Sequence, residues 1–229
     1  MRRHSLVFPA LALMLAWPVF LAAADAAGST LAGTLSLVER GAVVNEAADA
    51  VVWFVPSSHV APAAPVRAEI MTRERRFSPR VTVVPVGSDV WFPNSDPILH
   101  NVFSVSAGNR FDLGLYRKGP GKSARITKAG LVRVYCNVHQ AMSAFVLALD
   151  TPYVTRPAAD GRFLLDGLPP GEGTLFVWHE RAELLSRAVT LPHEAALAVT
   201  VEVRAAGAIE HLDKNGRPYR ESKSNDEYR

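Results

Sequence analysis

The stretch from 131 to 149, LVRVYCNVHQAMSAFVLAL, decides how the rest of the chain is interpreted. Its two ends, 131–135 and 144–149, are short runs rich in Val, Leu and aromatic side chains, which is typical of β-strands. Between them, Cys136, His139 and Met142 follow one another at intervals of three residues. A thiol, an imidazole and a thioether therefore share one tight loop between two predicted strands.

Similar apolar runs recur on the N-terminal side of this stretch, and Gly, Pro, Asn or Ser separate them. They cover 31–38, 51–55, 81–86, 90–92 and 102–105. Helical periodicity is scarce after residue 28, apart from a brief helical alternative within 45–50. Repeated short strands with turn signals between them predict an all-β fold of the sandwich type.

The C-terminal part of the chain predicts a second unit. A break falls at Asp150-Thr-Pro152, and strand-like runs then follow at 161–168, 174–178 and 195–203. We therefore expect a first sandwich over 25–150 and a small β-sandwich module over 151–206. The last segment, 207–229, is polar with mixed charge, so we expect a disordered tail.

Composition excludes several classes of protein. The chain has 229 residues, 48% of them hydrophobic and 21% charged, which is too apolar for a disordered protein. A formal net charge of +3 gives little support for nucleic-acid binding. The single cysteine, Cys136, excludes an intramolecular disulfide, a four-cysteine zinc site and an iron–sulfur cluster held by this chain alone.

The N-terminus has the pattern of a secretory signal peptide over 1–24. Arg2 and Arg3 precede an apolar run from 6 to 21, and Ala22-Ala-Ala24 fits a cleavage site. A transmembrane anchor is the alternative, but the run is shorter than the roughly 20 residues of a span and contains two prolines. We expect an exported, periplasmic protein that has no membrane span after cleavage.

A second histidine, His100, lies 36 residues before Cys136 in the segment His100-Asn101-Val102. Two imidazoles and a thiolate in one plane, with a weak axial thioether, suit an ion that alternates between Cu(I) and Cu(II). Zinc with a bound water is the rival, although Met142 is a poor zinc ligand. A Cys–His hydrolase is conceivable too, but no oxyanion loop is evident.

Taken together, Cys136-x-x-His139-x-x-Met142 and the upstream His100-Asn101-Val102 resemble the cupredoxins, the type 1 blue-copper proteins. The short loop is similar to that of amicyanin, and 84–94, VPVGSDVWFPN, is similar to plastocyanin-type and methylamine utilisation protein-like sequences. The resemblance implies a Greek-key β-sandwich with one type 1 copper. It implies His100, Cys136 and His139 as in-plane ligands and Met142 as the axial ligand. It also implies electron transport and no enzymatic activity.

The chain departs from this pattern in two respects. Val138 stands where amicyanin and plastocyanin carry a proline before the loop histidine. The trailing module has no counterpart in the usual cupredoxin. Through 166–171, DGLPPG, that module resembles carboxypeptidase-regulatory or transthyretin-like β domains.

Arg110 to Arg133 contains seven basic residues and one acidic residue, Asp112. An ordinary solvated face explains this pattern, and so does a docking surface for an acidic redox partner protein. Two other functions stay open at this point. One is a copper-binding carrier, sensor or scaffold module without electron transfer. The other is a structural protein that binds no metal.

Overall fold

The computed structural model describes residues 28–207 and 211–219, so the expected signal peptide over 1–24 lies outside the described residues. The described part is all-β, as the sequence predicts, with a single 3-10 turn, η1 (Ala47–Asp49). No helix in this part reaches the length and apolar character needed to cross a bilayer. The strands are β1 (Ser29–Glu39), β2 (Ala42–Val44), β3 (Val51–Pro56), β4 (Arg67–Glu69), β5 (Met71–Arg73), β6 (Arg76–Ser78), β7 (Val81–Pro85), β8 (Asp89–Asn94), β9 (His100–Ser104), β10 (Phe111–Tyr116), β11 (Gly119–Arg125), β12 (Gly130–Cys136), β13 (Ser143–Leu149), β14 (Val154–Thr155), β15 (Arg162–Leu168), β16 (Gly171–Trp178), β17 (Leu185–Leu191) and β18 (Leu197–Glu202).

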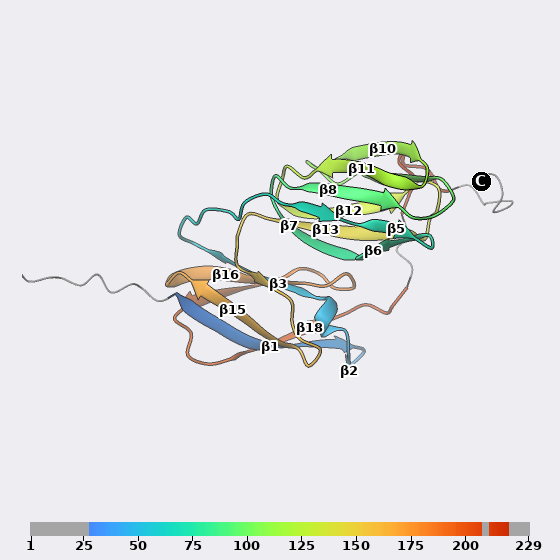
Figure 1. Cartoon of the computed structure of the whole chain (residues 1–229). Helices are drawn as coiled ribbons and strands as arrows, with labels where there is room; N and C mark the ends of the chain where they lie inside the picture. Colours follow the sequence, from blue (N-terminus) through green and yellow to red (C-terminus); the bar gives the residue numbers. More distant parts are fainter. Residues whose placement is uncertain (1–27, 208–210, 220–229) are drawn as a thin grey trace, which may run out of the picture.

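The strands form two sandwiches, one above the other in Figure 1. Sandwich I, residues 67–149, packs the sheet β10-β9-β12-β13-β7 against the sheet β11-β8-β5-β6, with β4 alongside β8. Sandwich II packs β15-β1-β18, with β2 beside β1, against β14-β3-β16-β17. Each sandwich encloses its own apolar core, because every inward-facing row of one sheet needs a partner sheet to cover it.

The expected domain boundaries need correction, because β1, β2 and β3 belong to sandwich II. β1 pairs in parallel with β18 from Gly33↔Leu197 to Val38↔Glu202, and β3 pairs with β16. Leu31, Leu35 and Leu37 of β1 are buried there at 0–2% exposure. Sandwich I is thus inserted between β3 and β14. The first sandwich does not begin at residue 25, and the second is built from both sides of the insertion.

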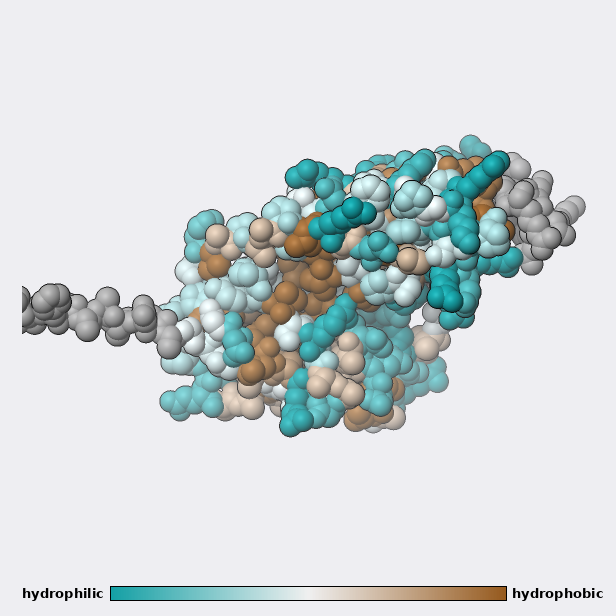
Figure 2. Space-filling model, viewed as in Figure 1, coloured by the Kyte–Doolittle hydropathy of each residue, from teal (hydrophilic) through white to brown (hydrophobic). Residues whose placement is uncertain are grey.

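β13 and β3 are buried on both faces, which explains their unbroken apolar sequences. In β13, Ala144, Val146 and Ala148 face the core of sandwich I, whereas Phe145, Leu147 and Leu149 face sandwich II. In β3, Val52 and Phe54 face the core of sandwich II, whereas Val51 and Trp53 face sandwich I. The facing rows form a third apolar cluster, and brown side chains gather between the two sandwiches in Figure 2.

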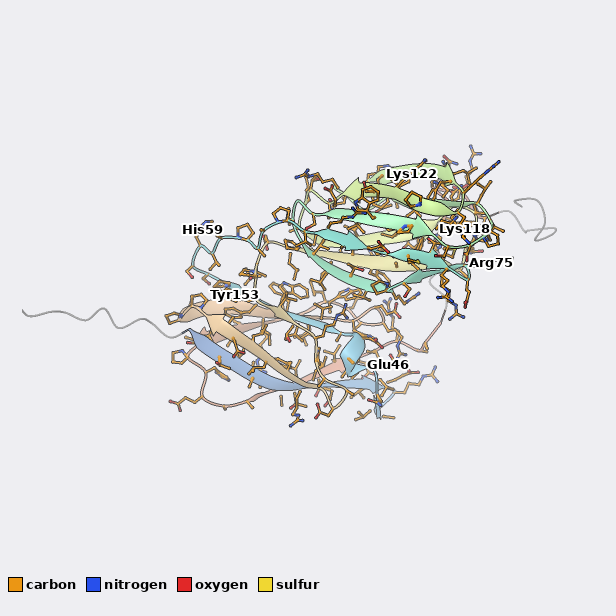
Figure 3. The ribbon with its side chains drawn as sticks, in the orientation of Figure 1. Glu46, His59, Arg75, Lys118, Lys122 and Tyr153 are labelled. Carbon is orange, nitrogen blue, oxygen red and sulfur yellow. The ribbon has the colours of Figure 1, made fainter. Side chains whose placement is uncertain are left out.

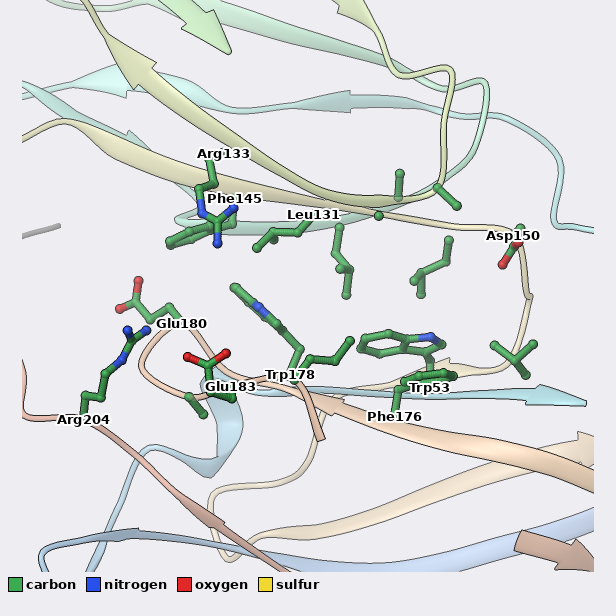
Figure 4. Close-up of a pocket in the computed structure, with 18 of the residues that line it drawn as sticks. Trp53, Leu131, Arg133, Phe145, Asp150, Phe176, Trp178, Glu180, Glu183 and Arg204 are labelled. Carbon is green, nitrogen blue, oxygen red and sulfur yellow. The ribbon is translucent and has the colours of Figure 1, made fainter. Parts of the chain in front are cut away.

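The sandwiches do not close on each other completely. A hollow of about 730 Å³ lies between them, with Leu131 and Phe145 on one side and Trp53, Phe176 and Trp178 on the other (Figure 4). The rings of Phe145 and Trp178 meet edge to face at 5.2 Å between centroids. An ion pair at the edge, Arg80 Nε to Glu180 Oε2 at 2.6 Å, adds a polar tie between the sandwiches.

The predicted disordered tail is also corrected in part. Residues 211–219 leave sandwich II and lie against sandwich I at the end of β12 (Figure 1). Residues 208–210 and 220–229 lie outside the described part.

Candidate metal centre

The loop that carries Cys136, His139 and Met142 is the tip of the β12–β13 hairpin, which begins beyond the pair Tyr135↔Ser143. The N–H of Cys136 donates to the carbonyl of Met142 at 3.2 Å, and the N–H of Met142 donates to the carbonyl of His139 at 3.1 Å. These bonds close the loop on itself. The interval of three residues therefore brings the three side chains to one tight turn.

The other predicted ligand arrives from the neighbouring strand. β9 pairs with β12 through Cys136↔Val102, and His100 begins β9 two residues earlier. The N–H of Asn137 donates to the carbonyl of Asn101 at 2.8 Å, which joins the loop to β9. The backbone of Asn101 therefore tethers the cysteine loop to the strand that carries His100.

The side chains of His100, Cys136 and His139 converge. The Sγ of Cys136 lies 3.7 Å from the Nδ1 of His100 and 3.7 Å from the Nδ1 of His139. One ligand atom from each residue lies within 4.8 Å of the others. His100 and Cys136 are fully buried, and His139 is partly exposed. Met142, 1% exposed, belongs to the same apolar core as Cys136.

This donor set fits a metal ion bound in the plane of three ligands. Bonds of about 2.3 Å to sulfur and about 2.0 Å to nitrogen, meeting at roughly 120°, would place sulfur and nitrogen about 3.7 Å apart. Both observed separations have this value. The thiol therefore lies from each imidazole nitrogen at the distance that one shared ion would require.

Protonation favours the same arrangement. Burial lowers the pKa of His100, and burial together with the charges of His100 and Arg75 lowers the pKa of His139 to about 4. Both rings are therefore neutral near pH 7. The Nε2 of His100 lies 2.9 Å from Oδ2 of Asp96, and a carboxylate only accepts. The ring proton of His100 accordingly sits on Nε2, which leaves Nδ1 free to face the thiol.

The thiol itself is held in an apolar setting. Burial raises the pKa of Cys136, although the backbone N–H groups of Asn101, Val138 and His139 act in the opposite direction. A free thiol in this place is protonated near neutral pH. A bound metal ion would displace that proton, and the N–H groups would then stabilise the thiolate.

Asp96 is a further residue of the candidate centre that the sequence did not reveal. It is 7% exposed, and its two carboxylate oxygens accept from the N–H groups of Glu74 at 2.6 Å and Arg75 at 3.0 Å. Burial alone would raise the pKa of Asp96, but these bonds and the one from His100 lower it. In the sequence, Asp96 precedes a proline in a polar turn, which signals only a loop.

The segment 211–219 also meets the loop, which nothing in its polar sequence indicates. The ring of His211 stacks on that of Tyr135 at 3.9 Å between centroids, and its Nε2 lies 2.8 Å from the carbonyl of Gln140. The phenol of Tyr219 donates to the carbonyl of Cys136 at 2.8 Å. The N–H of Lys214 donates to Oδ1 of Asn137 at 2.9 Å. We call this segment the C-terminal strap.

The other histidines do not join this centre. Within residues 28–207 and 211–219, His100, Cys136 and His139 form the one cluster of metal-ligating side chains of this kind. His59 is exposed, whereas His179 is buried. His179 lies 3.7 Å from Oε2 of Glu46, which also binds Arg181 at 2.7 Å. Arg181 and Glu46 thus form an ion pair, and His179 lies beside it.

Comparison with known proteins finds similar solved structures and no family. No protein-family model and no curated protein matches the chain. Among solved structures, it is similar to a purple cupredoxin from Nitrosopumilus maritimus (21% identity, 36% of this chain and 99% of that chain, TM-score 0.33). It is also similar to amicyanin from Paracoccus versutus (15%, 42% and 97%, TM-score 0.32). A copper-containing nitrite reductase from Thermus scotoductus matches at 21% identity over 49% of this chain and 28% of that chain, with a TM-score of 0.35. The structural neighbours of this all-β chain thus include cupredoxins.

Proposed function

We propose that this protein is an exported mononuclear type 1 copper protein that carries single electrons between redox partners. The observation that carries the proposal is the convergence of Nδ1 of His100, Nδ1 of His139 and Sγ of Cys136 in a buried site. A thiolate with two imidazoles suits both copper oxidation states, whereas zinc would gain nothing from the nearby thioether of Met142.

Each residue has a distinct task in this account. His100, Cys136 and His139 would hold the copper ion, and Met142 would be a weaker fourth ligand. Bound copper would supply the one-electron chemistry by alternating between Cu(I) and Cu(II). Asp96 holds the proton on Nε2 of His100 and keeps its Nδ1 turned inward. The closed loop and the buried core keep the ligands in place and exclude water, so little reorganises when the charge changes.

His139 is the natural exit for the electron, because it is the one partly exposed member of the triad. We assign no enzymatic step to the protein. A copper oxidase or nitrite reductase would need a second, histidine-rich copper site. Among the described residues, the remaining histidines form no such site: His59 lies on the connection between β3 and β4, His179 and His193 lie in sandwich II, and His211 lies on the C-terminal strap.

Export and partner choice belong to the same proposal. The pattern over 1–24 supports a periplasmic location. An acidic redox protein is the partner we propose, since basic residues are plentiful in sandwich I. Sandwich II, whose segment 166–171 resembles carboxypeptidase-regulatory domains, would serve to support and present sandwich I.

A visible absorption spectrum after addition of Cu(II) tests the proposal. We expect an intense thiolate-to-copper band in the wild type and in the control His59→Gln, whose histidine is exposed on a loop. The band should vanish in Cys136→Ser, because the thiolate is its source. Voltammetry of the same sample separates the alternatives: a reversible one-electron couple supports electron transfer, and an irreversible response favours a copper carrier. A colourless wild type overturns the proposal.

A further inference from the structure

Basic side chains gather around the end of sandwich I that holds the candidate metal centre. Arg73, Arg75 and Arg76 lie on the β5–β6 hairpin, and Arg117 and Lys118 lie in the turn between β10 and β11. All five are exposed. Glu74 is the single acidic residue within 73–76 and 117–118. Figure 3 shows Arg75 and Lys118 at the same end of the upper sandwich. We call these five residues the basic rim.

Strand register places both turns beside the centre. Tyr116 pairs with His100, so Arg117 and Lys118 follow directly at the end where the ligands lie. Thr72 pairs with Asn94, the last residue of β8, so the hairpin tip extends beyond the same end.

The hairpin is fixed to the centre through Asp96. Glu74 and Arg75 have φ values of 53° and 55°, a conformation that costs energy in residues other than glycine. Their N–H groups donate to the two oxygens of Asp96, and Oδ2 of Asp96 binds His100. The positive charges of the tip are therefore held in one place relative to a predicted copper ligand.

A groove of about 700 Å³ separates the hairpin from the ligand loop. Arg73, Glu74, Arg75 and Arg76 line its hairpin side, with Arg80 just beyond β6, and Ala141 and Met142 line its loop side. An acidic side chain that entered this groove would meet guanidinium groups on one wall and the loop of the centre on the other.

The basic residues of the segment 110–133 do not all lie at the end that holds the centre, because some lie at the opposite end of sandwich I. Arg125 pairs with Asp89, at the opposite end of β8 from Asn94, which corresponds to about 17 Å along the strand. The backbone of Lys128 binds Asn109, whose side chain ties down the turn at that far end. Arg125 and Lys128 are exposed but remote from the centre, so they provide a matched control.

We propose that the basic rim is the docking surface for an acidic partner protein that exchanges electrons with the candidate metal centre. This inference rests on the proposed function and specifies its partner surface. Fixed positive charge near the partly exposed His139 raises the local concentration of an anionic partner and orients it for close approach. The attraction acts over about 10 Å at moderate ionic strength. This range is long enough to orient an approaching partner and short enough that charges at the far end of the sandwich contribute little.

The first test needs no copper. A polyglutamate peptide is titrated into the ¹⁵N-labelled, metal-free protein, and amide shifts are followed by NMR. We expect saturable shifts at 73–76 and 117–118 that disappear at high salt. They should also be lost in Arg73→Glu/Arg76→Glu and retained in Arg125→Glu/Lys128→Glu. Shifts centred on 125–128, or no saturable shifts at all, overturn the rim as a docking surface.

The second test measures electron exchange with the copper-loaded, reduced protein. Ferricyanide takes one electron from Cu(I), giving Cu(II) and ferrocyanide with no atom transferred. Reversal of the two rim charges should slow this reaction on the order of 10-fold at low ionic strength and accelerate oxidation by a cationic cobalt(III) phenanthroline complex. The far-end variant should match the wild type, and equal slowing in both variants overturns the proposal. If the protein takes up no copper, the proposed function fails, while the peptide titration still decides the rim.

Discussion

Sandwich I and sandwich II share an architecture but differ in what their buried polar groups contact. In sandwich II, buried Arg181 binds Glu39 and Glu46 at 2.7 Å each, and buried His179 lies against the same Glu46. Opposite charges satisfy one another there. In sandwich I, two imidazole nitrogens and a thiol face one another at 3.7 Å. Those atoms are electron-pair donors that gain little from each other and much from a cation.

The difference shows where function resides in a fold of this type. Two β-sandwiches with separate apolar cores support one candidate site, and it lies at a loop end of sandwich I. The ion-pair network of sandwich II completes the structure and needs no ligand. We therefore expect some substitutions to lower the stability of the protein without changing metal binding, and others to weaken metal binding itself.

The largest effect on stability is expected at the contact between the sandwiches. Trp178→Ala removes a ring that is 6% exposed and packs on Phe145. The loss should lower the free energy of unfolding by about 3–5 kcal/mol, measured by denaturant unfolding. A loss below about 1 kcal/mol would mean that the interface contributes little to stability.

A core substitution in sandwich II should lower the stability of the protein and leave the candidate metal centre unchanged. Leu37→Ala deletes a fully buried side chain of β1 and should cost about 2–5 kcal/mol. At temperatures where the variant is folded, its visible copper spectrum should equal that of the wild type, because Leu37 belongs to the core of the other sandwich. A shifted copper absorption band would show that the core of sandwich II affects the metal centre in sandwich I.

Asp96→Asn tests the carboxylate behind His100. The amide offers one acceptor oxygen where the carboxylate offers two to Glu74, Arg75 and His100. Copper affinity, measured by competition with a chelator, should fall about 10–100-fold. Asp160→Asn on an exposed turn of sandwich II is the control, and an equal loss in both variants would count against the role of Asp96.

The smallest effect is expected at the C-terminal strap. Tyr219→Phe removes the hydrogen bond to the carbonyl of Cys136, which is worth about 1 kcal/mol. The amide of Asn137 in the loop should then exchange with solvent roughly five-fold faster, as followed by NMR. Tyr153→Phe, on sandwich II, should leave this rate unchanged, and identical rates in all three proteins would show that the strap does not restrain the loop.

The sequence predicted what depends on local pattern. Alternating and continuous apolar runs located most long strands, and the spacing from Cys136 to Met142 located the ligand loop. The membership of β1 and β3 was missed because parallel pairing of β1 with β18 joins segments more than 150 residues apart. Asp96 was missed because its role depends on two N–H groups at the tip of another hairpin. The strap was missed because hydrogen bonds and one ring stack hold it, and neither leaves an apolar pattern.

Copper binding at this centre is tested most directly by a crystal structure of the copper-loaded protein, with anomalous diffraction data collected at the copper edge. We expect one strong anomalous peak among His100, Cys136, His139 and Met142, with the sulfur of Cys136 still about 3.7 Å from the Nδ1 atoms of both histidines. A peak at His179 in sandwich II, or none near Cys136, would contradict this expectation.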